Sequence, residues 1–407
     1  MVGPVSGRSC AAGGSGQKAP ISRQRLRIAI VANEPSADLL GAGLLRALRA
    51  QGPTEIELTG IGGPLMAAEG MHSLYPQERL AVMGLWEVLK HLPELLRIRR
   101  DLARRLLQDP PDLFLGIDAP DFNLGLEKRL RRAGIPTFHY VCPTVWAWRQ
   151  GRVKKVRAAA EQVLCIFPFE PEFLARHGVP GRFVGHPLAD EIPMQVDAAA
   201  ARQALGLPMN GPLLALLPGS RRNELRFLAD DFLRAALLVW QQRPALHCVV
   251  PLLNPGLREQ FEQRRQAVAP ELPVTLIDGR SREVLAAADL ALTASGTATL
   301  EALLLKRPQV VAYRVHPLTY RIVAGLKLVK VRFFAMANLL ADEAIAPEFI
   351  QHAITPEALA NALLEILEQP KRQAHYIEVA ERVHREMKMD ASANAAAAIL
   401  QRLGVER

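Results

Sequence analysis

The sequence has few of the residues that form metal centres and disulfide frameworks. Only four of its 407 residues are cysteines, Cys10, Cys142, Cys165 and Cys248, and no CxxC or Cys/His spacing typical of a zinc site occurs. Thiols so few and so far apart predict buried, inert cysteines in a reducing compartment. Neither an HExxH motif nor a Walker loop is present, which excludes zinc-protease and P-loop chemistry.

Long apolar runs and aromatic residues are scarce as well. No stretch reaches the ~18 uninterrupted apolar residues of a membrane-spanning helix, because the closest one, 284–305, contains Asp289 and Glu301. Residues 1–24 lack the apolar core of a signal peptide, and their Gly, Ser, Ala and Pro content predicts a disordered extension. Aromatic residues make up 5% of the chain. Without an RNP strand, zinc finger or basic zipper, nucleic-acid binding is not expected.

Negative charge is also in short supply. The formal net charge is +9, and residues 85–160 contain 15 Lys and Arg against 8 Asp and Glu. Since nucleic acid is not expected, this local excess favours an anionic substrate or an anionic membrane surface as the partner.

Short apolar runs alternate with helical periodicity along most of the chain. Strands are expected at 27–32, 56–60, 112–117, 136–141, 162–167 and 182–185, and again at 212–217, 246–251, 273–277, 289–293 and 309–313. Helical patterns separate them at 39–50, 94–108, 122–133, 223–243, 281–288 and 297–306. This order predicts an α/β fold of two doubly wound, Rossmann-like parallel-sheet domains facing a cleft. We place these domains at 25–190 and 200–365, followed by a C-terminal helical tail at 366–407.

Ligands of such folds bind beyond the carboxyl ends of the strands, so the residues directly after each strand are site candidates. Strand 212–217 is followed by PGSRRNEL, in which Gly219 turns the chain, Ser220 can cap the next helix and Arg221 adds a positive charge. A helix N-terminus with an arginine beside it suits a phosphate. The alternative is an ordinary capped turn with a surface arginine.

The segment after strand 289–293 reads ASGTATLEALLL. Ser295, Gly296 and Thr297 open a helix there, which again suits an anion. Glu301 follows about one helical turn later, where its carboxylate can accept hydrogen bonds from a ribose diol. Together they indicate a nucleotide-sugar site, and the alternative is a carboxylate on a solvated helix face.

Two aspartates follow strand 112–117, in GIDAPDFNLGLEKRL. Asp118 and Asp121 flank a proline, so they do not easily share one helix face. One of them can act as a base facing the cleft while the other caps the helix. Asn123 can hold a sugar hydroxyl.

Two segments combine apolar and basic residues. In VCPTVWAWRQGRVKKV, Trp146 and Trp148 are followed by a run of arginines and lysines, and residues 80–105 are first apolar and then rich in arginine. Both are compatible with an amphipathic surface for a lipid or an anionic headgroup. The alternatives are a core tryptophan beside a solvated basic helix, and a buried helix followed by an exposed one.

Taken in order, nine blocks of the chain resemble the lipid-A-disaccharide synthase family. They are GIGGPLMAAEGM (60–71), LAVMGLWEVLKHLPELLR (80–97), GIDAPDFN (116–123), VCPTVWAWRQGRVKKV (141–156), FVGHPLAD (183–190), LLPGSRRNE (216–224), ASGTATLE (294–301), YRVHPLTY (313–320) and ANLLADE (337–343). The resemblance implies an inverting glycosyltransferase of GT-B architecture, with an acceptor-side N-terminal domain and a UDP-sugar-binding C-terminal domain. It implies transfer of 2,3-diacylglucosamine from UDP to the 6-hydroxyl of 2,3-diacylglucosamine 1-phosphate.

The resemblance also implies roles for particular residues. The catalytic set is Asp118, Arg221, Glu34 and Asn338; the UDP-binding set is Gly219, Ser220, Ser295, Gly296, Thr297 and Glu301; the acceptor or lipid side is Ser36, Asp38, Asn123, Trp146 and Trp148. Neither a cofactor nor a metal is expected, because helix dipoles and an arginine can carry the charge of departing UDP. The expected location is the cytoplasmic face of a bacterial inner membrane, contacted through 80–105, and a homodimer is compatible with the resemblance.

The chain departs from the family pattern at several glycines. Asn33 and Ala37 stand in the first strand–helix turn where glycines are expected, and Asp342 replaces another. Because asparagine tolerates positive φ best among non-glycine residues, Asn33 is expected to preserve one glycine conformation. Ala37 requires either an ordinary φ or a moved loop. Another GT-B UDP-sugar enzyme and a non-catalytic relative that binds UDP-sugar or glycolipid remain as alternative functions.

Overall fold

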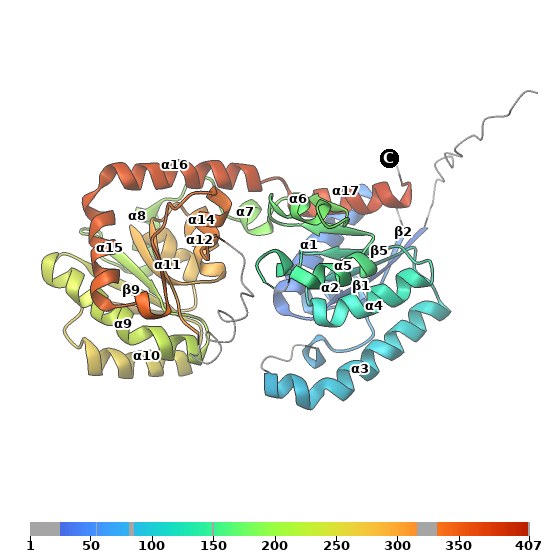
Figure 1. Ribbon diagram of the computed structural model, residues 1–407, viewed down its shortest axis with the longest axis horizontal. Helices are drawn as coiled ribbons and strands as arrows, with labels where there is room; N and C mark the ends of the chain where they lie inside the picture. Colours follow the sequence, from blue (N-terminus) through green and yellow to red (C-terminus); the bar gives the residue numbers. More distant parts are fainter. Residues whose placement is uncertain (1–24, 54, 81–84, 149, 316–331, 406–407) are drawn as a thin grey trace, which may run out of the picture.

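The protein folds around two parallel β-sheets, each covered by helices on both faces (Figure 1). The computed structural model describes residues 25–53, 55–80, 85–148, 150–315 and 332–405, and of residues 85–90 it describes the backbone only. The predicted disordered extension, 1–24, therefore lies outside the described residues, as does part of the apolar–basic segment at 81–84.

The first sheet has seven strands in the order β3-β2-β1-β4-β5-β6-β7. Its strands are β1 (Arg25–Ala32), β2 (Glu55–Ile61), β3 (His72–Ser73), β4 (Leu113–Ile117), β5 (Thr137–Tyr140), β6 (Gln162–Cys165) and β7 (Gly181–Phe183). The helices between them are α1 (Pro35–Gln51), α2 (Pro64–Ala68), α3 (Leu85–Gln108), α4 (Pro120–Arg132), α5 (Val153–Ala159) and α6 (Glu170–Ala175). The register pairs Ala32 of β1 with Ile117 of β4, so these two strands end side by side.

The second sheet has six strands in the order β10-β9-β8-β11-β12-β13. Its strands are β8 (Leu213–Leu217), β9 (His247–Leu252), β10 (Val274–Asp278), β11 (Leu290–Ala294), β12 (Gln309–Tyr313) and β13 (Glu348–Ile350). Its helices are α9 (Arg222–Gln242), α10 (Pro255–Val268), α11 (Ser281–Ala287), α12 (Thr297–Leu304), α14 (Met336–Ala341) and α15 (Pro356–Glu368), and α7 (Pro187–Glu191) and α8 (Ala198–Leu205) lead into it.

Burial explains why the strands are continuous apolar runs instead of alternating ones. In β1, Ile28 and Ile30 pack in one cluster with α1, while Ala29 and Val31 pack in another with α3 and α4. In β8, all five residues are buried for the same reason. A parallel sheet covered on both faces has this signature.

The predicted α/β fold with two parallel sheets is confirmed, and each of the eleven expected strands is present within a few residues. The strands β3 and β13 were not predicted, because runs of two and three residues carry no periodicity. Asp197 caps α8 as its position suggests, with its Oδ1 accepting from the N–H of Ala200 at 3.0 Å. Cys142, Cys165 and Cys248 are buried free thiols as expected, and Cys10 lies outside the described residues.

The last two helices pack on different sheets. Helix α16 (Pro370–Met387) joins the second core through Tyr376, Val379 and Val383. Helix α17 (Ala391–Leu403) lies beside α1 and joins the first core through Ala395 and Ile399 (Figure 1). The chain therefore returns to its first sheet at its end.

One carboxylate fixes the point at which the chain returns. The two oxygens of Asp190, just after the first sheet, accept from the N–H groups of Asp390 and Ala391 at 2.9 and 2.7 Å. Lys388 donates to the Asp190 carbonyl at 2.7 Å. Asp190 therefore links the segment that follows the first sheet to the segment between α16 and α17 that leads back to it.

Among the described helices, none is long and apolar enough to span a membrane.

We predict that packing of α17 against the first sheet and α1 contributes to the stability of the protein. Ile399→Ala removes a fully buried side chain from the first core and should lower the free energy of unfolding by about 2–5 kcal/mol. Arg402→Ala, in the same helix, removes only a surface ion pair with Glu161 and should cost less than about 1 kcal/mol. Urea denaturation measures both, and equal effects would contradict the assigned packing.

Candidate functional site

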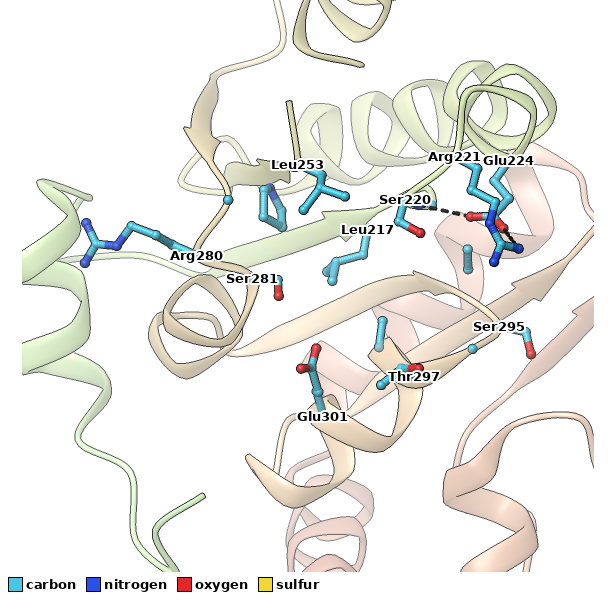
Figure 2. Close-up of a pocket in the computed structure, with 16 residues that line it drawn as sticks. Leu217, Ser220, Arg221, Glu224, Leu253, Arg280, Ser281, Ser295, Thr297 and Glu301 are labelled. Atoms are coloured by element: carbon cyan, nitrogen blue, oxygen red, sulfur yellow. Dashed lines mark hydrogen bonds and ion pairs between the residues drawn. The ribbon is translucent and has the colours of Figure 1, made fainter. Parts of the chain in front are cut away.

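A cavity of about 450 Å³ lies at the carboxyl ends of β8, β9, β10 and β11 (Figure 2). It is lined by Leu217, Gly219, Ser220, Arg221, Glu224, Pro251, Leu253, Gly279, Arg280, Ser281, Ala294, Ser295, Gly296, Thr297, Ala298 and Glu301. The strand order of the sheet reverses between β8 and β11, which is the place where doubly wound folds bind ligands. All six residues predicted from sequence to bind UDP, together with Arg221, line this one cavity.

The N-terminus of α9 forms one wall. Gly219, which lines the cavity, has a φ of 123° that residues with a Cβ rarely adopt. The Glu224 carboxylate accepts from the Ser220 N–H at 3.0 Å and pairs with Arg221 at 3.4 Å (Figure 2). The expectation that Ser220 caps the helix is wrong, because Arg221 is the N-cap residue and no side chain caps α9. A carboxylate thus occupies an anion position at this helix end.

The N-terminus of α12 forms the facing wall. Its N-cap residue is Gly296, with a φ of 146° that other residues rarely adopt, and no side chain caps the helix. A Cβ at this position would meet no atom within 4 Å, so it would project into open space. The backbone here can therefore be approached closely by a ligand. Ser295, beside it, donates to the Phe334 carbonyl at 3.4 Å.

Glu301 is oriented by an arginine that sequence reasoning missed. Its side chain is 12% exposed, and Oε1 accepts from Nε of Arg282 at 3.0 Å. The same guanidinium pairs with Glu191 of α7 at 2.7 Å. One carboxylate oxygen is thereby held by the protein while the side chain faces the cavity (Figure 2). No motif marks Arg282, because only the fold brings α11 against α12.

The backbone is strained at the carboxyl edge of the first sheet, the edge that corresponds to the cavity side of the second sheet. Asp118 and Ala119, directly after β4, have φ values of 52° and 42°, and Val141 after β5 has 74°. Left-handed backbone costs a non-glycine residue free energy, most of all a β-branched one. It is held here by bonds from the Asp118 N–H to the Tyr140 carbonyl, at 2.8 Å, and from Asn123 Nδ2 to the Asp118 carbonyl, at 2.9 Å. No side chain caps α4, so the expected capping role of one aspartate is wrong.

Glu34 lies at the same edge as Asp118, because β1 and β4 are neighbours and end in register. Its carbonyl accepts from the buried Gln77 amide at 2.9 Å, and its side chain is half-buried. The expectation that Asn33 adopts left-handed backbone is wrong, because its φ is not positive. Ala37 lies inside α1 with ordinary helical backbone. The turn therefore does not need glycine at either position.

Two residues placed on the acceptor side are buried within the protein. Asp38 is 2% exposed and accepts from the N–H groups at the start of α2, those of Gly63, Leu65 and Met66, at 2.9, 2.9 and 3.0 Å. Asn123 is fully buried below the Asp118 turn. Both residues position the edge of the sheet. Ser36, in the first turn of α1, is exposed.

Asn338 is also a positioning residue in this structure. It is 1% exposed, and its amide bonds both the N–H and the carbonyl of Ala346 at 2.8 Å. Its Nδ2 also donates to Glu348 at 2.7 Å, and Glu348 accepts from the N–H groups of Phe334 and Ala335 at 2.9 Å. This network shapes the loop that contacts Ser295. Asp342, where the family pattern has glycine, ends α14 with a φ of 52° and so keeps the glycine conformation.

The two tryptophans after β5 have different environments. Trp146 donates to Glu170 at 3.1 Å, and complete burial raises the pKa of that carboxyl to about 8. Trp148 is 39% exposed and donates to the Thr144 hydroxyl at 3.2 Å. Trp146 therefore anchors the loop, while Trp148 presents an aromatic surface beside the sheet edge.

The structure thus gathers the predicted nucleotide residues in one cavity and separates the predicted acceptor residues into buried and exposed ones. Among the described residues, no group of three or more His, Cys, Asp or Glu side chains is arranged to hold a metal ion.

Comparisons with known proteins agree over nearly the whole chain. A family model described as lipid-A-disaccharide synthetase matches residues 28–402. Lipid-A-disaccharide synthases from Pseudomonas paraeruginosa and Azotobacter vinelandii are both 55% identical to the chain, covering 93% and 92% of it and 98% of each relative. The corresponding protein of Alkalilimnicola ehrlichii is 51% identical, covering 93% of the chain and 99% of the relative.

Solved structures share the fold at low sequence identity. A UDP-GlcNAc 2-epimerase from Neisseria meningitidis bound to UDP-GlcNAc has a TM-score of 0.56 and 13% identity, covering 93% of this chain and 99% of that one. A calicheamicin glycosyltransferase has a TM-score of 0.58 and 17% identity, covering 93% and 98%. The expected GT-B architecture is therefore confirmed.

We predict that Gly296→Ala weakens UDP binding about tenfold, because a left-handed φ costs a side chain about 1–2 kcal/mol and relaxing it moves the helix end away from the ligand. Gly404→Ala is the matched control. Gly404 also has positive φ, 67°, and open space around it, but it lies after α17. Calorimetric titration with UDP should separate the two variants, and equal affinities would remove Gly296 from the site.

Proposed function

Because the chain belongs to the lipid-A-disaccharide synthase family, we propose that the two sheet edges described above carry out the glycosyl transfer that forms the lipid A disaccharide. The donor is UDP-2,3-diacylglucosamine and the acceptor is 2,3-diacylglucosamine 1-phosphate. The products are the β-1,6-linked disaccharide 1-phosphate and UDP. The observation that carries the assignment is the convergence of Gly219, Arg221, Gly296 and Glu301 on one cavity.

In this proposal the cavity of the second sheet holds UDP. The diphosphate takes the anion position now filled by the Glu224 carboxylate, at the Ser220 N–H and the Arg221 guanidinium. The ribose hydroxyls donate to Glu301, which Arg282 holds in place. Arg221 is 69% exposed, so its guanidinium is accessible to a phosphate.

The chemical step is a single in-line displacement. Asp118 accepts the proton of the acceptor 6-hydroxyl while that oxygen forms a bond to the donor C1. The bond from C1 to the diphosphate oxygen breaks, and the electron pair leaves with UDP. Arg221 and the N-termini of α9 and α12 stabilise the charge that develops on the leaving group. Inversion at C1 follows from one attack on the face opposite UDP.

The strained backbone gives Asp118 a defined direction. Two consecutive left-handed residues fix where its side chain leaves the sheet edge, and the Asn123 amide below resists relaxation. Glu34, on the neighbouring strand end, adds a second carboxylate at the same edge. Together they suit the activation and orientation of a sugar hydroxyl.

The lipid side is proposed to lie along α3. An open cavity of about 1370 Å³ borders this helix. Its lining includes the apolar residues Leu92, Pro93, Leu96 and Ile98 and the arginines Arg79, Arg97, Arg100, Arg104 and Arg129. Glu94 and Asp101 also line it and pair with Arg79 and Arg104, so positive charge remains in excess beside the apolar residues. This combination suits acyl chains with anionic headgroups around them. We therefore place the protein on the cytoplasmic face of the inner membrane, in contact through this surface.

The function is tested by incubating the purified protein with both substrates and following UDP release and disaccharide formation. A donor consumed without the lipid acceptor would favour another UDP-sugar enzyme of the same fold. UDP binding without any product from fresh substrates would favour a non-catalytic relative.

We predict that Asp118→Asn lowers kcat by about 10²–10⁴, the usual contribution of a general base. Its UDP affinity should stay within about twofold of the wild type, because the nucleotide cavity lies on the other sheet. Asp109→Asn, near the opposite end of β4, removes only surface contacts with Arg27 and should leave kcat unchanged. Full activity of the Asp118 variant would exclude it as the base.

Glu301→Gln should raise the Kd for UDP about tenfold, since hydrogen bonds to a charged acceptor contribute about 1.5–3 kcal/mol. Glu368→Gln removes a carboxylate that pairs with Arg243 on the surface and should not change this Kd. Titration with UDP and with uridine monophosphate would show a similar loss for both ligands, because the ribose contact is common to them. An unchanged Kd would place the ribose elsewhere.

A further inference from the structure

We propose that a basic cavity between α3, α4 and α5 binds the phosphate monoester of the lipid acceptor. The proposal rests on the function proposed above and assigns a subsite to one group of its acceptor. The cavity measures about 440 Å³, and its lining includes Arg99, Lys128, Arg152, Lys154 and Lys155. Among the residues that the structure describes, Asp121 is the one acidic residue that lines it.

Three separate segments supply these cations. Arg99 comes from α3, Lys128 from α4, and Arg152, Lys154 and Lys155 from the start of α5 and the turn before it. Convergence of five positive side chains on one hollow is unfavourable without a counter-charge. A solvated basic helix face, the alternative from sequence, would spread its charges on one element instead of enclosing a cavity.

Most of this charge is unpaired. Arg152 pairs with Asp121, and Arg99 donates to the Asp121 carbonyl at 3.4 Å. In the part of the chain that the structure describes, Lys128, Lys154 and Lys155 form no ion pair with a carboxylate, and all three are exposed. Three unpaired ammonium groups around a hollow match a phosphate dianion, which has three acceptor oxygens.

A glycine makes room for one of the cations. A Cβ at Gly125 would lie 2.7 Å from Nη1 of Arg99. The missing side chain lets the guanidinium of α3 lie across α4, where it reaches the cavity. Larger residues at this position would displace Arg99 or force it into another rotamer.

The cavity lies near the proposed catalytic edge in the chain. A smaller cavity of about 140 Å³ shares Pro120, Asp121, Leu124 and Arg152 with it and extends to Trp148. Asp121 follows Asp118 by three residues, at most about 11 Å along the chain. A sugar bound beside Trp148 can therefore present its hydroxyl to Asp118 while its phosphate lies among the lysines. Trp148 offers an apolar ring face of the kind that sugars and lipid headgroups contact.

The test compares two acceptors in neutral detergent micelles, the monosaccharide lipid with its 1-phosphate and the same lipid with a free 1-hydroxyl. In the double variant Lys154→Gln/Lys155→Gln, the KM for the phosphorylated acceptor should rise about tenfold or more while kcat changes little. Kinetics with the unphosphorylated acceptor should equal those of the wild type. Lys371→Gln/Arg382→Gln, which removes two exposed cations from α16, is the charge-matched control and should change neither KM.

Two further measurements distinguish the sources of the phosphate. Inorganic phosphate should compete with the phosphorylated acceptor in the wild type and more weakly in the Lys154/Lys155 variant. An equal loss with both acceptors would overturn the proposal. The proposal would also be overturned if the Lys154/Lys155 variant kept the wild-type ratio of the KM values for the two acceptors but sedimented more weakly with phosphatidylglycerol vesicles. The cavity would then bind membrane headgroups. Equilibrium binding of the phosphorylated acceptor tests the cavity independently of turnover. Absence of turnover would contradict the proposed function and not this inference.

Discussion

The parallel pairing of β1 with β4 and of β8 with β11 is the constraint on which both halves of the site depend. In each sheet these are the two strands between which the order reverses, so the helices that follow them leave on opposite faces. The space between those helices is where polar groups following the strands can meet a ligand. Glu34 and Asp118 occupy that place in the first sheet, and Gly219 and Gly296 occupy it in the second.

The two sheets use this place differently, and their backbones show it. After β8 and β11 the positive φ values fall on Gly219 and Gly296, for which they cost little, and the backbone there is accessible to a ligand. After β4 they fall on Asp118 and Ala119, for which they are costly. A rigid side chain at the first edge and accessible backbone at the second suit the base and the phosphate site proposed above.

Local signals in the sequence predict the fold well, and they also identify residues that line the cavity of the second sheet. Both depend on short segments, since a buried strand and the helix start after it are read from a dozen neighbouring residues. The acceptor side depends on contacts between segments far apart. Burial of Asp38 against the start of α2, and of Asn123 beneath Val31, could not be read from their own neighbours. Arg282 was missed for the same reason.

The proposed nucleotide cavity and the basic cavity between α3, α4 and α5 each contain an arginine that is already paired with a carboxylate. Arg221 pairs with Glu224 in the first, and Arg152 pairs with Asp121 in the second. Such a pair keeps the guanidinium close to its working position without a bound ligand, so less side-chain entropy is lost when an anion arrives. The arriving phosphate exchanges one anionic partner for another instead of introducing a new charge. In the nucleotide cavity the exchange also returns the Glu224 carboxylate to water, and after transfer the carboxylate can compete again for the same N–H group and guanidinium. For the UDP binding proposed above, the pairing reduces the ordering needed on binding and supplies a competitor that promotes release, which suits a site that must empty after every turnover.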